Sequence, residues 1–254
     1  MRTSVDYDRS QHAVYARARA LTPASAALWR EVLGRYLDGR LGSTVLDLGC
    51  GTGRYSRLIA ESFGVDVVGV EPSTRMREAA AREGSHPRVR YLAGSGERVP
   101  LPDASCDAAL LSDVAHHLDD PAACARELHR VLRPDATLLV RGILPESLPG
   151  VAFIEFFPPA RPIAERQTGA YAEFLETLEA NGFASVAREA IEQEVAPSLS
   201  AYRDRVGLRA ISTLELIDDA EFEAGMKRMS EAAERAVPAR PVVELVNLAV
   251  LRRD

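Results

Sequence analysis

The stretch VLDLGCGTGRYS, residues 45–56, joins an apolar run to a glycine-rich turn and then to a helix-compatible segment. Glycine permits a sharp turn and lets a ligand lie against bare backbone, although many glycine-rich turns only reverse the chain. A helix that follows such a turn offers unpaired N–H groups to an anionic group. Asp47 stands two residues before Gly49, where it would repel a pyrophosphate and attract a cationic ligand. The dinucleotide pattern G-x-G-x-x-G also fails, because its third glycine would fall at Arg54.

Strands and helices alternate downstream of this turn. Short runs of apolar, often β-branched residues are separated by helix-compatible stretches, and such strands predict a parallel sheet covered on both faces. We expect strands at Thr44–Leu48, Val65–Val70, Val89–Leu92, Cys106–Leu111 and Thr137–Val140. We expect helices at Gly53–Phe63, Ser73–Glu83 and Pro121–Leu132, the last with Asp120 as its N-cap.

The pattern changes after Arg141 and then resumes. Residues 142–167 are rich in proline and predict an irregular insertion, while residues 199–236 are charged and helix-compatible. The alternation is completed by a helix at Ala170–Ala180, a strand at Ser185–Ile191 and a final strand at 241–253. The predicted fold class is therefore α/β: a Rossmann-like, mostly parallel seven-stranded sheet with helices on both faces.

Composition narrows the classes of function. The chain has 254 residues, 46% of them hydrophobic, which suffices for one sizeable core. Its formal net charge of -6 argues against a protein that tracks nucleic-acid phosphates. The three cysteines are odd in number and lack metal-ligand spacing, so we expect reduced thiols and no metal site. The sequence shows neither the apolar stretch of a signal peptide nor an apolar run of roughly 20 residues that would span a bilayer. These features predict a cytoplasmic protein without a membrane partner.

A second acidic residue stands at a distance typical of ribose binding. Glu71 closes the second expected strand, about 20 residues after the glycine turn, where an acid reaches a ribose diol across the neighbouring strand. An acid at this position also suits the cap of a helix that starts at Ser73, so both roles are open when Glu71 is taken alone. The nearby glycine turn favours the ribose role.

Four motifs in this order resemble a known family. They are LDLGCGTG (46–53), VGVEPS (68–73), GSGERVPLPDASCDAALLSDVAHHLDDP (94–121) and LHRVLRPDATLLVR (128–141). Together they resemble the class I S-adenosylmethionine (SAM)-dependent methyltransferases. Within that class they are similar to the small-molecule group of the ubiquinone and menaquinone biosynthesis methyltransferases. The resemblance covers about residues 40–142, and it extends to the C-terminal half only through the helix-strand pattern. The resemblance indicates the cofactor specifically and gives almost no information about the acceptor.

The resemblance implies a set of cofactor-binding residues and a division of the chain. The implied cofactor contacts are Tyr15, Arg19, Asp47, Gly49, Cys50, Gly51, Glu71, Pro72, Met76, Ser95, Gly96, Glu97 and Ser112. By this resemblance, Asp47 would hold the ammonium group of SAM, and Glu71 would bind both ribose hydroxyls. Ser95 stands where related enzymes usually have an aspartate, so it would make a weaker contact with the adenine. We expect a helical lid at 1–40 and a SAM-binding domain at 41–254, with both insertions gathered at the acceptor site.

The N-terminal pair Tyr15 and Arg19 lies one helical turn apart on one face. In related enzymes such a pair closes over SAM, and the arginine meets its carboxylate. The same two residues also suit the solvated face of a surface helix that carries Arg17 as well.

The candidates for a catalytic base follow the fourth expected strand. Asp113, His116 and His117 come soon after it, at the edge of a parallel sheet where ligands bind. Methyl transfer from a sulfonium is an in-line substitution that alignment alone promotes, and a base adds about 10²–10⁴-fold for a hydroxyl, phenol or acidic carbon. We favour His116, whose imidazole is expected to titrate near pH 6.5, while His117 equally suits a packed or capping role.

No motif specifies the acceptor. Five aromatic residues of the insertions either wall an apolar pocket or pack in the core: Phe153, Phe156, Phe157, Tyr202 and Phe222. We predict methyl transfer to an O, N or C atom of a small molecule, with no nucleic acid as partner, by a monomer or homodimer. The alternative is a protein of the same fold that binds SAM or S-adenosylhomocysteine without transferring a methyl group.

Overall fold

The computed structural model describes residues 12–39 and 42–254 and contains a seven-stranded sheet. The strands are β1 (Thr44–Leu48), β2 (Asp66–Glu71), β3 (Val89–Ala93), β4 (Cys106–Ser112), β5 (Leu132–Gly142), β6 (Phe183–Ala196) and β7 (Val242–Arg253). Their order across the sheet is β3-β2-β1-β4-β5-β7-β6. Strands β1 to β5 run parallel, and β7 lies antiparallel between β5 and β6. The predicted α/β class with a mostly parallel seven-stranded sheet is confirmed.

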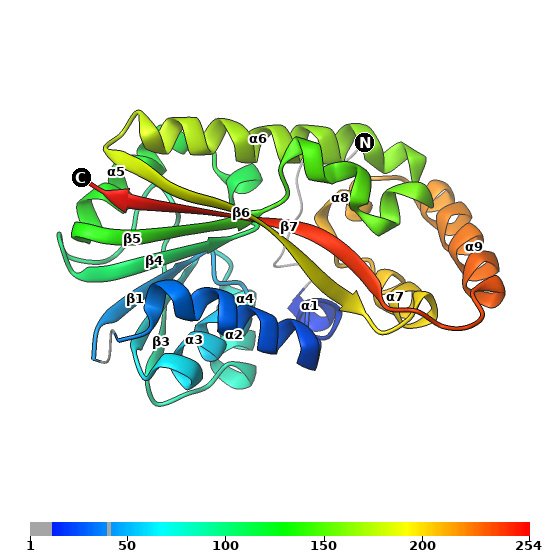
Figure 1. Ribbon diagram of the computed structural model, residues 1–254, viewed down its shortest axis with the longest axis horizontal. Helices are drawn as coiled ribbons and strands as arrows, with labels where there is room; N and C mark the ends of the chain where they lie inside the picture. Colours follow the sequence, from blue (N-terminus) through cyan, green and yellow to red (C-terminus); the bar gives the residue numbers. More distant parts are fainter. Residues whose placement is uncertain (1–11, 40–41) are drawn as a thin grey trace.

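Helices cover both faces of the sheet (Figure 1). One face is covered by α5 (Pro121–Val131) and α6 (Arg161–Glu179). The other is covered by α2 (Pro23–Leu37) and α3 (Arg54–Phe63), and α4 (Thr74–Glu83) packs beside β3 and β2. Beyond one end of the sheet lie α1 (His12–Ala18), α7 (Leu199–Val206), α8 (Ser212–Glu215) and α9 (Asp219–Arg235). Short 3-10 segments are η2 (Ala115–His117) after β4, and η3 (Pro145–Gly150), η4 (Ala152–Glu155) and η5 (Pro158–Ala160) after β5.

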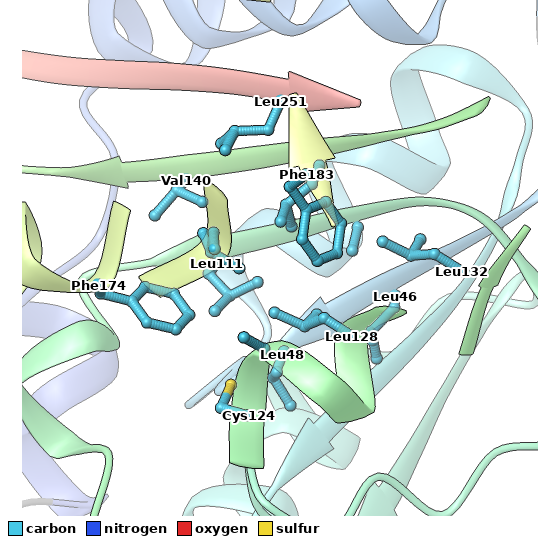
Figure 2. Close-up of a cluster of buried hydrophobic side chains, with 14 of the residues drawn as sticks. Leu46, Leu48, Leu111, Cys124, Leu128, Leu132, Val140, Phe174, Phe183 and Leu251 are labelled. Carbon is cyan, nitrogen blue, oxygen red and sulfur yellow. The ribbon is translucent and has the colours of Figure 1, made fainter. Parts of the chain in front are cut away.

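The core is built from strand side chains that alternate between the two faces. Leu46 and Leu48 of β1 point into the cluster that contains Phe174 of α6 (Figure 2). Val45 points the other way, into a cluster built around Trp29 of α2. Because both faces are buried, the inner strands are apolar almost throughout. A third apolar cluster fills the space between η3–η5 and α7–α9, so the two insertions have a core of their own.

The described part of the segment expected as a helical lid at 1–40 is helical. It is divided into α1 and α2, and Thr22 marks the boundary. The Thr22 hydroxyl accepts a hydrogen bond from the Ser25 N–H at 3.0 Å, and Pro23 takes the first helical position, where no backbone donor is needed. Residues 1–11 and 40–41 of the expected lid and domain boundary lie outside the described residues.

The insertion at 142–167 also differs from the irregular segment that was expected. It holds three 3-10 segments and the first two turns of α6, which begins at Arg161 rather than at Ala170. Pro162 stands in the first turn of α6, where a proline is tolerated, so it does not break the helix there. Strand β6 is likewise longer than expected, because it pairs with β7 along almost its whole length. Among the described residues, no helix is both long and apolar enough to cross a bilayer.

Candidate cofactor and acceptor site

The glycine loop lies between β1 and α3 and is held over the end of β2. The N–H groups of Gly49 and Cys50 donate to the Val70 carbonyl at 2.8 and 3.2 Å. Gly49 has a φ of 69°, and a Cβ added to it would lie 2.6 Å from the Val114 side chain. Any larger residue at position 49 would therefore strain the backbone and collide with the segment after β4, whether or not a ligand is bound. The sequence predicted roles for Gly49 in the turn and in ligand contact, and its close packing against Val114 is an addition.

A cavity of about 560 Å³ opens beside this loop. Ten of the thirteen residues that the resemblance implies as cofactor contacts line it: Tyr15, Gly49, Gly51, Glu71, Pro72, Met76, Ser95, Gly96, Glu97 and Ser112. A Cβ added to Gly51 would lie 3.6 Å from the Met76 side chain, so this glycine presents bare backbone to the cavity. Glu71 Oε2 accepts from the Gly51 N–H and Glu71 Oε1 from the Ser73 N–H, both at 3.0 Å. Bare backbone next to a carboxylate fits the methionine and ribose parts of SAM.

Three of the implied contacts lie outside this cavity. Asp47 is buried beneath the glycine loop and accepts a hydrogen bond from the Ser56 hydroxyl at 2.5 Å, and burial raises the pKa of Asp47 to about 6. Cys50 is buried against the middle of β2, where its Sγ would lie 2.8 Å from a Cβ on Gly69. Arg19 lines a second cavity instead.

The second cavity has a volume of about 180 Å³ and lies among the insertions. Its apolar wall includes Leu148, Val151 and Phe153 from the segment after β5 and Val206 from α7. Of the five aromatic residues expected at the acceptor site or in the core, Phe153 and Tyr202 line this cavity. The other three belong to the third apolar cluster, and the rings of Phe157 and Phe222 stack with centroids 5.6 Å apart.

The two cavities meet after the end of β4. The residues that line both are Tyr15, Asp113, Val114, His116, His117 and Gln167. All three candidates for a catalytic base are thus at the junction. Asp113 has a φ of 61°, in the left-handed region, so the chain turns sharply where β4 ends and η2 begins.

Asp113 is the centre of a charge cluster at this junction. Its Oδ2 accepts hydrogen bonds from Arg141 at 2.7 Å, Arg19 at 3.2 Å and Arg54 at 3.3 Å. Burial pushes the pKa of Asp113 upward, but the charges of Arg141, Arg19 and Arg54 outweigh it and hold that pKa well below its usual range. A carboxylate held in this way is a poor proton acceptor at neutral pH.

Arg141 is fixed by neighbours on several sides. Its guanidinium group lies 4.8 Å from the centre of the Trp29 ring, and its Nη2 donates to Gln193 Oε1 at 2.8 Å. Gln193 Oε1 also accepts from the Trp29 indole N–H at 2.8 Å. The packing of α2 against the sheet therefore determines where the Arg141 charge lies.

His116 is partly buried at the same junction. Its ring centre is 4.0 Å from that of His117, and its Nε2 lies 3.5 Å from the Ser212 hydroxyl of α8. Burial, together with repulsion from His117, lowers the pKa of His116 to about 3. The expectation that this imidazole titrates near pH 6.5 is therefore wrong for the free protein, in which His116 is neutral at pH 7.

Sequence reasoning missed several polar residues of the second cavity. They are Arg54, Arg141, Gln167, Gln193, Arg205 and Glu244. A signal was present for Arg141, since a charged residue at the end of an otherwise apolar inner strand needs a partner. For Arg205 the sequence offered none, because α7 carries several charged residues and only the fold shows which one faces inward.

Comparisons with known proteins agree with this geometry. Residues 46–140 match the family model described as a methyltransferase domain. The chain is similar to a malonyl-[acyl-carrier protein] O-methyltransferase of Serratia marcescens, at 37% identity over 138 residues, 53% of this chain and 52% of the relative. It is also similar to a demethylmenaquinone methyltransferase of Corynebacterium kroppenstedtii, at 37% identity over 120 residues, 47% of this chain and 50% of the relative. The chain spans about half the length of these curated relatives.

A solved phosphoethanolamine N-methyltransferase of Haemonchus contortus superposes with a TM-score of 0.58 at 19% identity, over 97% of this chain and 59% of that one. Likeness at this identity establishes the fold. The sheet order, the glycine loop and the matched segment together define a class I methyltransferase domain. Residues 46–140 therefore form a methyltransferase domain, and the cofactor of this class of domain is S-adenosyl-L-methionine.

Proposed function

We propose that the chain is a SAM-dependent methyltransferase that acts on an O, N or C atom of a small-molecule acceptor. The observation that carries this proposal is the junction of the two cavities after β4. The larger cavity, bordered by the glycine loop and Glu71, suits the cofactor, and the smaller one suits the acceptor. A methyl group presented at the junction would be within reach of an acceptor in the second cavity.

Each side of the cofactor cavity has a proposed role. Glu71 binds the ribose hydroxyls, because each carboxylate oxygen can accept more than one hydrogen bond. Asp47 lies beneath the glycine loop, so its charge attracts the cofactor ammonium across the loop rather than by contact. Ser95, Gly96 and Glu97 border the adenine end.

Catalysis is proposed to rest chiefly on alignment. When bound, SAM supplies a methyl group on a good leaving group, and the chain's task is to hold the acceptor atom in line with it. Alignment of this kind contributes roughly 7–11 kcal/mol to lowering a barrier. Among the described residues, six line both cavities, and an acceptor in the second cavity would meet the methyl group there.

His116 is the proposed proton acceptor when the nucleophile is a hydroxyl or phenol. It is neutral at pH 7 because its pKa is about 3, so it is able to accept a proton but is a weak base in the free protein. A negatively charged group bound beside it would raise that pKa and strengthen the base.

The N-terminal segment and the insertions are proposed to form the lid and the acceptor wall. Tyr15 of α1 borders both cavities, and Arg205 of α7 donates to the Ala18 and Ala20 carbonyls at 2.9 and 3.1 Å. The segment after α1 is thus tied to the second insertion, which supports a lid that closes over both ligands together. A cytoplasmic location and a monomeric or homodimeric state stay predictions from the sequence.

The test combines binding with product analysis. Calorimetry should show that the protein binds S-adenosylhomocysteine, and incubation with methyl-labelled SAM and a panel of phenols, amines and carboxylic acids should yield a labelled product by mass spectrometry. Gly51→Val, which fills the bare backbone of the cofactor cavity, should abolish both results. Binding without any labelled product would favour the alternative, a protein that binds SAM or S-adenosylhomocysteine without methyl transfer. Absence of binding would reject the proposal.

A further inference from the structure

The wall of the second cavity carries more positive than negative charge. Four arginines line it, Arg19, Arg54, Arg141 and Arg205, against two acidic residues, Asp113 and Glu244. The two histidines of the wall add no charge at neutral pH, because burial lowers the pKa of both. Among the described lining residues the balance is thus two positive charges in excess, in a cavity of about 180 Å³.

Hydrogen bonding within the wall leaves this excess in place. A single oxygen, Asp113 Oδ2, serves Arg19, Arg54 and Arg141 together. Arg205 donates to the backbone carbonyls of Ala18, Ala20 and Val195 and forms no ion pair with an acid of the described residues, although the charge of Glu244 acts on it.

Glu244 is the second acid of the wall, and the charges of Arg19 and Arg141 act on it. Its Oε1 accepts from the Tyr202 hydroxyl at 2.7 Å and from the Ala152 N–H at 3.1 Å, and no arginine of the wall is hydrogen-bonded to it. Burial raises the pKa of Glu244, which weakens it further as a counter-charge.

Uncompensated cations in a confined space are costly, and a bound anion removes that cost. The cofactor as a whole does not supply the missing charge: its carboxylate can meet Arg19, but its ammonium and sulfonium groups leave SAM with a net charge of +1. Cofactor binding therefore increases the local positive charge. The acceptor is the remaining ligand that can balance it.

We infer that the acceptor is a small carboxylate-bearing molecule, held in the second cavity by its arginine-rich wall. This inference rests on the proposed function, because it names the class of acceptor that the methyltransferase takes. The cavity is about as large as an engineered pocket that holds benzene, so its volume suits an acceptor of roughly one ring or an equivalent chain. Leu148, Val151 and Phe153 contact the apolar part, and arginines attract the carboxylate.

The test compares two ligands of nearly equal shape, benzoate and the neutral benzamide. Each is titrated calorimetrically into the protein, first without cofactor and then saturated with S-adenosylhomocysteine. We expect benzoate to bind at least about tenfold more tightly than benzamide in the loaded protein, which corresponds to about 1.4 kcal/mol. Equal affinities, or no binding of benzoate once S-adenosylhomocysteine is present, would overturn the inference, since the latter would assign the arginines to the cofactor carboxylate.

Substitutions at Arg205 of α7 separate the effect of its positive charge from its effect on the fold. Arg205→Gln should weaken benzoate binding at least fivefold more than it weakens benzamide binding, whereas Arg205→Lys, which keeps the charge, should retain most of the affinity. Arg203→Gln is the matched control, because Arg203 lies two positions away on the same helix, pairs with Asp204 and does not line the cavity. If Arg205→Gln does not fold, the Arg205→Lys variant and the comparison of benzoate with benzamide in the wild-type protein still test the inference. Failure of the protein to bind S-adenosylhomocysteine, measured by calorimetry before the loaded titrations, would instead refute the proposed function, independently of the benzoate result.

Discussion

Asp113 allows the charge arrangement to be tested through stability. Asp113→Asn keeps the shape and one acceptor oxygen, removes the charge and tolerates the φ of 61°. The 2.7 Å contact with Arg141, whose side chain is only 6% exposed, should lose about 2 kcal/mol as a charge-assisted hydrogen bond. The longer contacts with Arg19 and Arg54, whose side chains are 28% and 19% exposed, should lose less than about 1 kcal/mol each because water screens them. We expect the free energy of unfolding to fall by about 3 kcal/mol.

Urea denaturation followed by circular dichroism measures this loss, and the thermal midpoint should fall by about 6–12 °C for a chain of this size. Asp103→Asn is the control: Asp103 pairs with Arg130 at 2.8 Å but is 79% exposed, so its loss should stay below about 1 kcal/mol. The pKa of Asp113 is lowered by folding, so its stabilisation is present above the unfolded pKa of about 3.9 and is lost as the pH falls through the folded value. The difference between wild type and variant should be constant near neutrality and shrink below about pH 4. A loss equal to that of the control at pH 7 would refute the reasoning.

Three further predictions concern ligand binding and catalysis. Glu71→Ala should weaken S-adenosylhomocysteine binding, measured by calorimetry, by about 1.5–3 kcal/mol, or roughly 10–150-fold. The control Glu83→Ala, at the exposed end of α4, should not weaken it, and unchanged affinity in Glu71→Ala would contradict the ribose role. Hydrogen exchange in residues 12–20 should slow when S-adenosylhomocysteine is added; protection confined to the glycine loop would leave the cofactor site and reject the lid. With a phenol acceptor, His116→Ala should lower kcat roughly 10²-fold and leave the affinity for S-adenosylhomocysteine unchanged, and a decrease in kcat below about threefold would leave alignment as the mechanism. The acidic limb of the wild-type pH-rate profile should lie below pH 6.5, since the pKa of His116 is about 3.

The sheet, and the residues that gather around the larger cavity, could be predicted because their signals are local. The strands β1 and β4 are buried on both faces, so continuous apolar runs mark them, and the glycine loop requires positive φ at Gly49, Gly51 and Gly53. The start of α6 could not be placed in the same way. Pro162 suits the first turn of a helix as well as a loop, and the choice depends on packing of α6 against the sheet, which a local pattern does not contain.

The sequence predicted the pKa of His116 and the charges of the second cavity poorly, because both depend on contacts between distant segments of the chain. Asp113 is separated from Arg19 by 94 positions and from Arg54 by 59, and the three meet only because α1 and the start of α3 come to the end of β4. Once they meet, the ionised state of Asp113 is fixed by its partners, which disfavours Asp113 as a base and leaves the two histidines as candidates. The three candidate bases after β4 could therefore be named from the sequence, whereas the reason to set Asp113 aside required the fold.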